Sequence, residues 1–270
     1  QDMMIMRIIN DAKWKVPIYF AVTVSQNNRI GLDRYLDMQG LTFQLKSHKT
    51  DPIDTVRMYE NLMTDVGANL WSTEFVKTDF NNPDDLGYLN WNRDYQPGYM
   101  FRNLGNEAIY YNKQTKRLLQ NYRSAYMQLA VTYYMDYQRE NRKKKNKDEA
   151  LIADLKSKIV GTLDKMNQNI PDHTIPIQSE DLHYQVARMY GDLKEHTSMR
   201  KIMDKLITRK TGKPVNRVEY ANTYYKELDD TEKALEILEN MRTQYLQMEG
   251  MVKTRPFSKN SVSEKDWGRW

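Results

Sequence analysis

A helical pattern that recurs in the second half of the sequence is the feature that most constrains the fold of this chain. The segment "VARMYGDL" aligns with "YANTYYKEL", which brings Ala187 onto Ala221 and Tyr190 onto Tyr224 with the same offset. A small residue lets two helices approach each other closely, and a tyrosine three positions later lies on the same face of the helix. The repeated pair therefore predicts similar helix pairs that pack side by side.

The offset between the two segments matches the period of tetratricopeptide repeats, which are stacked helix–turn–helix units of about 34 residues. An earlier copy of the pair, Ala130 with Tyr133, lies more than one period before Ala187, so the first unit carries an insertion that we assign to the charged segment 139–149. The segment "EKALEILENM" is the most typical second helix of such a unit. We therefore expect residues 116–250 to form a tetratricopeptide-like helical repeat, an α-solenoid.

Start signals for individual helices support this interpretation. Ser179 is a favourable N-cap residue, Pro214 suits the first turn of a helix, and Asp229 and Asp230 precede the last helix. Gly212 is expected to end the helix before Pro214. Apolar residues at steps of three and four predict that the last helix buries one set of side chains, namely Ala234, Leu235, Leu238, Met241 and Tyr245.

The N-terminal residues follow a different pattern. The run from Ile18 to Val24 is rich in β-branched and aromatic residues, which predicts a strand covered on both faces. The longest apolar run, Val16 to Val24, is too short to cross a bilayer, which needs about 20 residues. We expect residues 1–66 to form a small α/β module with helices over 2–12, 32–40 and 54–66 and strands over 18–24 and 41–45. So small a sheet needs further cover, from the helical part or from another domain.

Two other segments are expected to lack repeats. Residues 67–115 read as a long aromatic-rich loop region, irregular at least as far as residue 105, and its aromatic side chains favour docking on a surface over disorder. Residues 251–270 are expected to form an extended tail, with Trp267 and Trp270 holding it to the body of the protein.

Motifs for catalysis or metal binding are missing from the sequence. The chain has no cysteine, no phosphate-binding glycine loop, no HExxH and no nucleophile elbow. Its four histidines are scattered, and Asp84 with Asp85 reads as a turn and helix cap in preference to a cation site. We therefore predict no catalytic residue, no metal and no cofactor in this chain.

Charge and tyrosine content bear on partners. The formal net charge is +5, and its densest run, Arg142 to Lys147, is interpreted as a solvated loop because no aromatic residues are interleaved; we predict no nucleic-acid partner. Tyrosines on repeat helices are usually core residues. The alternative is that Tyr133, Tyr190 and Tyr224 line the concave face of the solenoid and bind an acceptor polypeptide or glycan.

Two longer segments resemble a family of bacterial integral-membrane proteins. "IINDAKWKVPIYFAVTV" followed by "GLDRYLDMQGLTFQL" resembles the region after that family's last membrane helix, and "MFRNLGNEAIYYNKQTKRLLQNYRSAYMQLA", residues 100–130, resembles the lead into its tetratricopeptide-like tail. The family is grouped with protein O-mannosyltransferase-like glycosyltransferases of the GT-C type. Three positions depart from its pattern: Val16 replaces the usual arginine, Gln39 the usual glutamate and Asn112 the common aspartate.

The resemblance implies a parent enzyme that moves a sugar from a polyprenyl-phosphate donor to protein at the periplasmic face of the inner membrane. Its catalytic acid would lie among membrane helices that this chain does not include, so the chain alone is not expected to be an enzyme. Since Gln1 is no natural initiator, we expect a fragment that is soluble by itself. Its expected role is to position the acceptor protein or to brace the transmembrane part of the same parent.

Two alternatives belong to other classes of function. The chain would instead be a stand-alone tetratricopeptide-type scaffold that binds peptides or partner proteins, or a carbohydrate-binding lipoprotein with such helices. The coding sequence upstream of Gln1 separates the three hypotheses. Several apolar segments of about 20 residues would support the membrane enzyme, and a signal peptide would support the alternatives.

Overall fold

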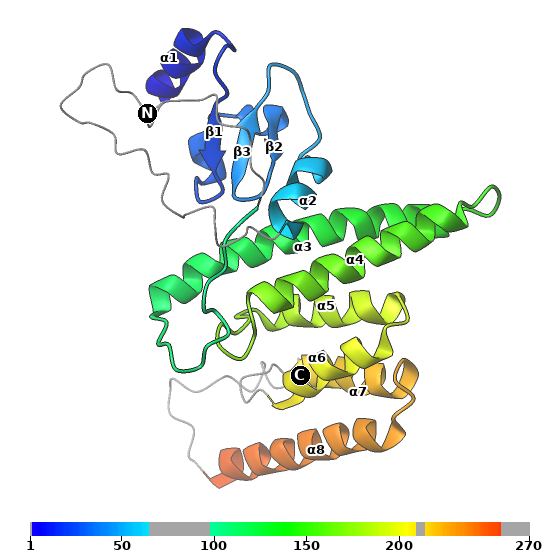
Figure 1. Ribbon diagram of the computed structural model, residues 1–270. Helices are drawn as coiled ribbons and strands as arrows, with labels where there is room; N and C mark the ends of the chain where they lie inside the picture. Colours follow the sequence, from blue (N-terminus) through cyan, green and yellow to red (C-terminus); the bar gives the residue numbers. More distant parts are fainter. Residues whose placement is uncertain (1, 65–97, 209–213, 255–270) are drawn as a thin grey trace. The chain divides into compact units, whose positions relative to one another are not determined.

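The computed structural model describes residues 2–64, 98–208 and 214–254. The described residues are mostly helical, with α-helices α1 to α8 and a small three-stranded antiparallel sheet near the N-terminus (Figure 1). The chain divides into two units, Gln1–Ile177 and Gln178–Trp270, which are described one after the other. Among the described helices, none is both long and apolar enough to cross a membrane.

The sheet of the first unit has the strand order β1-β3-β2, and both pairings are antiparallel. Its strands are β1 (Tyr19–Ala21), β2 (Leu36–Met38) and β3 (Thr42–Leu45), with the 3₁₀ turns η1 (Gln26–Arg29) and η2 (Leu32–Tyr35) between β1 and β2. Phe20, Leu36 and Leu45 form its buried cluster. The Arg29 guanidinium covers Phe43 at 4.2 Å from the ring centroid, so a cation completes one side of this small core.

Two predictions for the sheet are correct only in part. The strand predicted over 18–24 is only three residues long, and Phe20 alone of β1 is buried while its neighbours are exposed. The helix predicted over 32–40 is the turn η2 followed by β2. A short apolar run has the same composition whether one face or both faces are covered, so periodicity could not separate these cases. The strand predicted over 41–45 is confirmed as β3.

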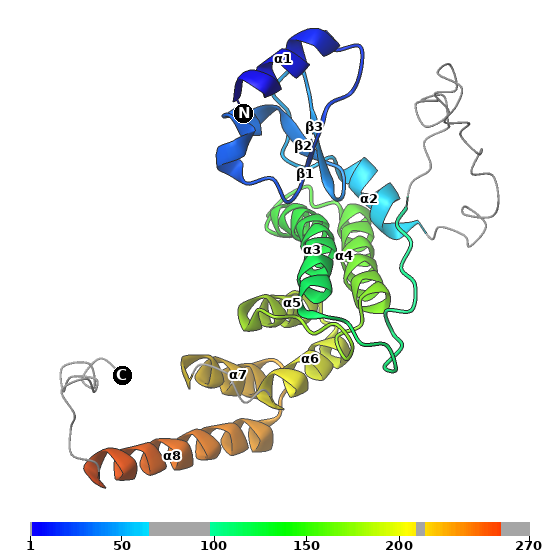
Figure 2. The ribbon, with the colours of Figure 1, turned by 90° about the vertical axis from the view of Figure 1, so that its left-hand side faces the viewer.

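Helix α1 (Asp2–Ala12) has the predicted bounds. Ile5 and Ile9 pack against the buried cluster of the sheet, although no residue of α1 is itself buried. The helix ends where Lys13 and Trp14 adopt left-handed backbone conformations, with φ of 48° and 60°. In both ribbon views α1 and α2 lie on different sides of the strands (Figures 1 and 2).

Helix α2 (Thr55–Met63) begins at Asp54, whose side chain accepts a hydrogen bond from the Arg57 backbone N–H. It buries Met58 and Leu62. Val56, although apolar, is 65% exposed. The helix packs on α3, where the Tyr126 hydroxyl donates to the Leu62 carbonyl at 2.7 Å.

A long helical hairpin completes the first unit. It pairs α3 (Lys113–Asn141) with α4 (Glu149–Asn169), which begin at the capping side chains of Asn112 and Asp148. Arg123, only 1% exposed, donates to the carbonyls of Ile170 and Ile175 and so fixes the segment after α4. The rings of Tyr99 and Phe101 pack edge-on against Tyr122, which confirms docking for these two aromatic residues.

The second unit contains two helix pairs, α5 with α6 and α7 with α8. Their bounds are α5 (Glu180–Asp192), α6 (His196–Thr208), α7 (Pro214–Lys226) and α8 (Thr231–Thr254), and each pair is visible in Figure 2. Ser179 caps α5 and Pro214 opens α7, as predicted. The Tyr220 hydroxyl donates to Glu180 at 2.7 Å, so a tyrosine joins the first pair to the second.

The buried face predicted for the last helix was wrong at three positions. Ala234 and Ile237 are buried in α8, whereas Leu235, Leu238 and Tyr245 are exposed, because among the described elements α8 packs mainly on α7 and buries only a narrow stripe. Residues 251–254, which were predicted to belong to the tail, are part of α8. Most of the predicted loop region, the rest of the tail and Gly212 lie outside the described residues.

Candidate functional site

The three tyrosines predicted to line a groove are buried side chains. Tyr133 lies on α3, Tyr190 on α5 and Tyr224 on α7, with exposed fractions of 8%, 1% and 0%. Tyr133 belongs to the first unit and the other two to the second, so they are treated separately. A partner at the surface would not touch these rings, which pack between helices. Binding of a partner by the same helices stays a prediction.

Burial explains the acid–base behaviour of Tyr133. Desolvation, followed by the nearby Tyr59 and Asp154, raises the pKa of Tyr133 to about 12. Lys158 lies 5.8 Å from the centre of its ring. The phenol therefore stays neutral near neutral pH and acts as a packing group between α3 and α4.

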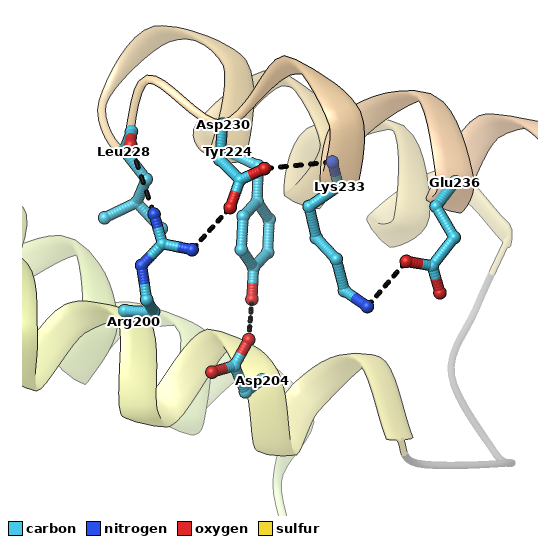
Figure 3. A network of polar contacts seen from close by, with 7 residues as sticks. All are labelled: Arg200, Asp204, Tyr224, Leu228, Asp230, Lys233 and Glu236. Atoms are coloured by element: carbon cyan, nitrogen blue, oxygen red, sulfur yellow. Dashed lines mark hydrogen bonds and ion pairs between the residues drawn. The ribbon is translucent and has the colours of Figure 1, made fainter.

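Tyr224 is part of a polar network that joins α6, α7 and the start of α8 (Figure 3). Its hydroxyl donates to Asp204 at 2.6 Å, while Arg200 pairs with Asp230 and donates to the Leu228 carbonyl at 3.2 Å. Burial and the bond to Asp204 raise the pKa of Tyr224. The network fixes the angle between successive helices, which is a structural role.

Asp230 has two partners in the same network. Its carboxylate accepts from Arg200 and from the Lys233 backbone N–H at 3.0 Å, so it caps α8 as the sequence predicted. The bond from Arg200, then the one from the Lys233 backbone, lowers the pKa of Asp230. The Lys233 side chain continues the network to Glu236, so the charged groups that Figure 3 labels are used in contacts among themselves.

The part of the chain that the structure describes contains no candidate metal site. No three residues of the His, Cys, Asp and Glu types lie together there as a set that could hold a metal ion. His183 is buried on α5, and His173 lies 3.9 Å from Glu107 at the surface. The pair Asp84 and Asp85 lies outside the described residues.

The strongest candidate for function is an apolar surface on the N-terminal module. Helix α1 exposes Met3, Met4, Met6 and Ile8, although Ile5 and Ile9 already supply its contact with the sheet. Met4 and Ile8 are one turn apart, on one flank of the stripe that Ile5 and Ile9 form, and Met6 lies on the other flank. The apolar arc of α1 is therefore wider than the sheet that it covers.

Three further exposed side chains extend this apolar character beyond α1. Trp14, Val16 and Tyr19 follow the helix, and each is about half exposed, at 53%, 50% and 49%. We call these three and the four exposed residues of α1 the N-terminal apolar residues. Helices that are apolar on several sides are normally covered by protein or lipid, so this module has the composition of an incompletely covered interface.

Part of this surface was readable in the sequence. The pattern of α1 indicated a helix, and the small sheet indicated a need for further cover. The sequence did not indicate which residues stay exposed, because Met4 and Ile5 are both apolar. Only the position of the sheet under Ile5 and Ile9 separates them.

The N-terminal module is also the part of the chain that matches a known family. Comparisons with curated proteins and with solved structures find no match for the chain. The match to the family covers less than half of the chain, so the glycosyltransferase expectation for the whole stays a prediction. Residues 1–66 match the family model described as TMEM260-associated domain 2. This segment contains the sheet, α1, α2 and the N-terminal apolar residues. The description of the family links it to a membrane protein.

Proposed function

We propose that this chain is a non-catalytic accessory domain of a membrane protein O-glycosyltransferase, located on the periplasmic side of the inner membrane. Its N-terminal module braces the transmembrane part of the same parent protein, and its helices position the acceptor protein. The observation that carries the proposal is the set of N-terminal apolar residues within the segment that matches TMEM260-associated domain 2. The sugar is supplied by a polyprenyl-phosphate donor at the membrane part.

The energetics favour a protein partner for these residues. Burying an aliphatic side chain completely stabilises a contact by about 1.5–3 kcal/mol, so several half-exposed side chains together supply enough for a stable intramolecular interface. Helix α1 presents Met4 and Ile8 side by side, one turn apart on a regular backbone. Trp14 and Tyr19 add large, stiff rings, which are frequent in the centres of protein interfaces.

The helix pairs are proposed to be tetratricopeptide-like repeats. One line of support is that the offset from Ala187 to Ala221 equals the offset from Tyr190 to Tyr224. All four side chains are buried, so the residues that match in sequence also have matching environments. Support also comes from the pairing of α5 with α6 and of α7 with α8. Repeats of this kind offer long surfaces for polypeptides, which also suits the alternative function, a stand-alone scaffold that binds peptides.

The first test is the activity of the chain alone. Purified residues 1–270, incubated with polyprenyl-phosphate mannose and an acceptor protein, are expected to transfer no sugar, because the resemblance puts the catalytic acid among membrane helices that this chain does not include. Turnover by this chain would contradict the accessory role.

The second test uses the complete parent protein in its membrane. Met4→Ser with Ile8→Ser is expected to lower sugar transfer several-fold, because the module loses its contact with the membrane part. Ile109→Ser with Tyr110→Ser is the control, since these two residues are also exposed and apolar but lie before α3, outside the helices. Unchanged transfer in the Met4 and Ile8 variant would contradict the bracing role of the N-terminal apolar residues.

A further inference from the structure

The charge of this chain is concentrated at one turn. Residues 139–147, which span the end of α3 and the turn toward α4, contain six Lys and Arg residues against one Glu. The excess of five equals the formal net charge of +5 of the whole chain, so the rest of the sequence is balanced. Figure 1 shows this turn at the end of the α3–α4 hairpin. We call it the basic tip.

The acidic residues next to the basic tip are used to build it. Glu140, only 7% exposed, pairs with Lys143 and accepts from the Asp148 backbone N–H at 3.0 Å. The bond from Lys143, followed by the one from Asp148, lowers the pKa of Glu140. Asp148 in turn caps α4. These carboxylates hold the turn closed and cannot also neutralise the remaining cations.

Three cations of the tip point to an external partner. Arg142, Lys144 and Lys145 are exposed, and within the described ranges none of them takes part in an ion pair. Like charges this close repel one another unless an anion lies nearby. Cations near the C-terminal end of a helix stabilise its dipole, and Arg139, which pairs with Asp136, already lies there in α3. The stability of the helix end therefore does not explain the other cations of the tip.

An open hollow of mixed polar and apolar lining lies beside one of these cations, Arg142. It has a volume of about 540 Å³, and its described lining residues all belong to α3 or its C-terminal end: Tyr134, Met135, Gln138, Arg139 and Arg142. The Gln138 amide donates to the Tyr134 hydroxyl at 2.8 Å, and the Tyr134 ring stacks on Tyr137 with centroids 6.4 Å apart. The hollow is thus a shaped surface with aromatic and thioether groups at one end and two guanidinium groups at the other.

We propose that the hollow and the basic tip together bind an acidic segment of a polypeptide. One apolar or aromatic side chain of the segment rests on Tyr134 and Met135, and its flanking carboxylates pair with Arg142, Lys144 and Lys145. Guanidinium groups suit carboxylates because they donate two parallel hydrogen bonds. The proposed peptide site shares no residue with the N-terminal apolar residues, so it does not depend on the bracing role.

Other anionic partners fit less well. Small-molecule sites enclose most of their ligand, whereas the described wall of this hollow is a single helix that leaves Met135 61% exposed. Single-stranded nucleic acid is bound by aromatic rings interleaved with cations, and the run from Lys143 to Lys147 contains none. A bilayer surface offers no side chain to occupy the hollow.

The experiment measures binding of a fluorescent synthetic peptide, with a central Phe between Glu residues, to the full chain at low salt. Lys144→Glu with Lys145→Glu is expected to weaken binding about tenfold, because each reversal replaces an attraction by a repulsion of similar size. The matched control is Lys113→Glu with Arg117→Glu, two exposed cations on the same helix but roughly 35–45 Å away, at about 1.5 Å per residue. The control is expected to bind like the wild type.

A double-mutant cycle tests the hollow separately. Met135→Ala is expected to weaken the Phe peptide about threefold and to leave a peptide with Ala in place of Phe unchanged, since Met135 is exposed and its loss does not disturb the fold. Equal effects on both peptides, or equal effects of the tip and control variants, would overturn the proposal. Binding of phosphatidylserine vesicles or duplex DNA without binding of the peptide would overturn it as well.

Discussion

At the scale of single residues, Tyr224 shows how a repeated spacing in the sequence becomes a physical contact. The residue that marks the repeat period donates its hydroxyl to Asp204 and lies in the network of Arg200 and Asp230 (Figure 3). The sequence placed it on a helix and suggested either core or ligand contact. The structure assigns it to packing, because the ring is fully buried.

Tyr224→Phe tests the value of that hydroxyl. The variant keeps the ring and loses one hydrogen bond to a carboxylate, so we expect the free energy of unfolding to fall by about 1–2 kcal/mol. Tyr225→Phe is the matched control, since Tyr225 is the next residue on α7 and is 57% exposed. Urea unfolding followed by circular dichroism measures both. Equal stability of the two variants would contradict the role of the network.

The raised pKa of Tyr133 predicts loss of stability in alkali. A tyrosine in the unfolded chain ionises near pH 10, whereas folded Tyr133 holds its proton until the pH reaches its pKa of about 12. The unfolded state therefore releases the proton first as the pH rises, and stability that is complete below about pH 10 declines between about pH 10 and 12. In Tyr133→Phe this decline is expected to be flatter, as measured by urea midpoints across that range. An identical slope would count against the prediction.

At the scale of elements, α1 is a helix with more apolar surface than its sheet covers. Ile5 and Ile9 provide the observed contact, and Met3 and Met4 provide none within the buried cluster. We expect Ile5→Ala with Ile9→Ala to release α1 from the sheet. Each substitution removes a partly buried side chain and is expected to weaken the contact between α1 and the sheet by about 1 kcal/mol.

Hydrogen exchange of the α1 backbone amides measures this release. Fast exchange in the Ile5 and Ile9 variant is expected, together with unchanged exchange in the control Met3→Ser with Met4→Ser, whose side chains are exposed. Faster exchange in the control would show that the two methionines already contribute to the folded module.

The elements that were predicted well are those with local signals. Caps at Ser179 and Asp230, and proline at 214, fix helix starts closely, so these starts could be read from the sequence. Burial could not be read so well. Val56 and Leu235 have the apolar character of core residues, and only the position of the neighbouring elements leaves them exposed.

At the scale of the whole molecule, two different surfaces carry the proposed interactions. The N-terminal apolar residues are proposed to meet the membrane part of the parent protein, and the basic tip is proposed to bind an acidic polypeptide. The sequence analysis expected cover for the sheet but interpreted the basic run as a solvated loop. The hollow beside the basic run could not be predicted, because its shape depends on the side-chain conformations of α3 residues that lie one turn apart.

The most direct test of the central claim is site-specific photocrosslinking in the complete parent protein. A benzophenone side chain replaces Met4 or, as the control, the similarly exposed Leu235, and the products are mapped by mass spectrometry. The account predicts crosslinks from position 4 to a transmembrane segment of the same protein and none from position 235. Crosslinks from position 4 to soluble proteins only, or to no protein at all, would contradict the account.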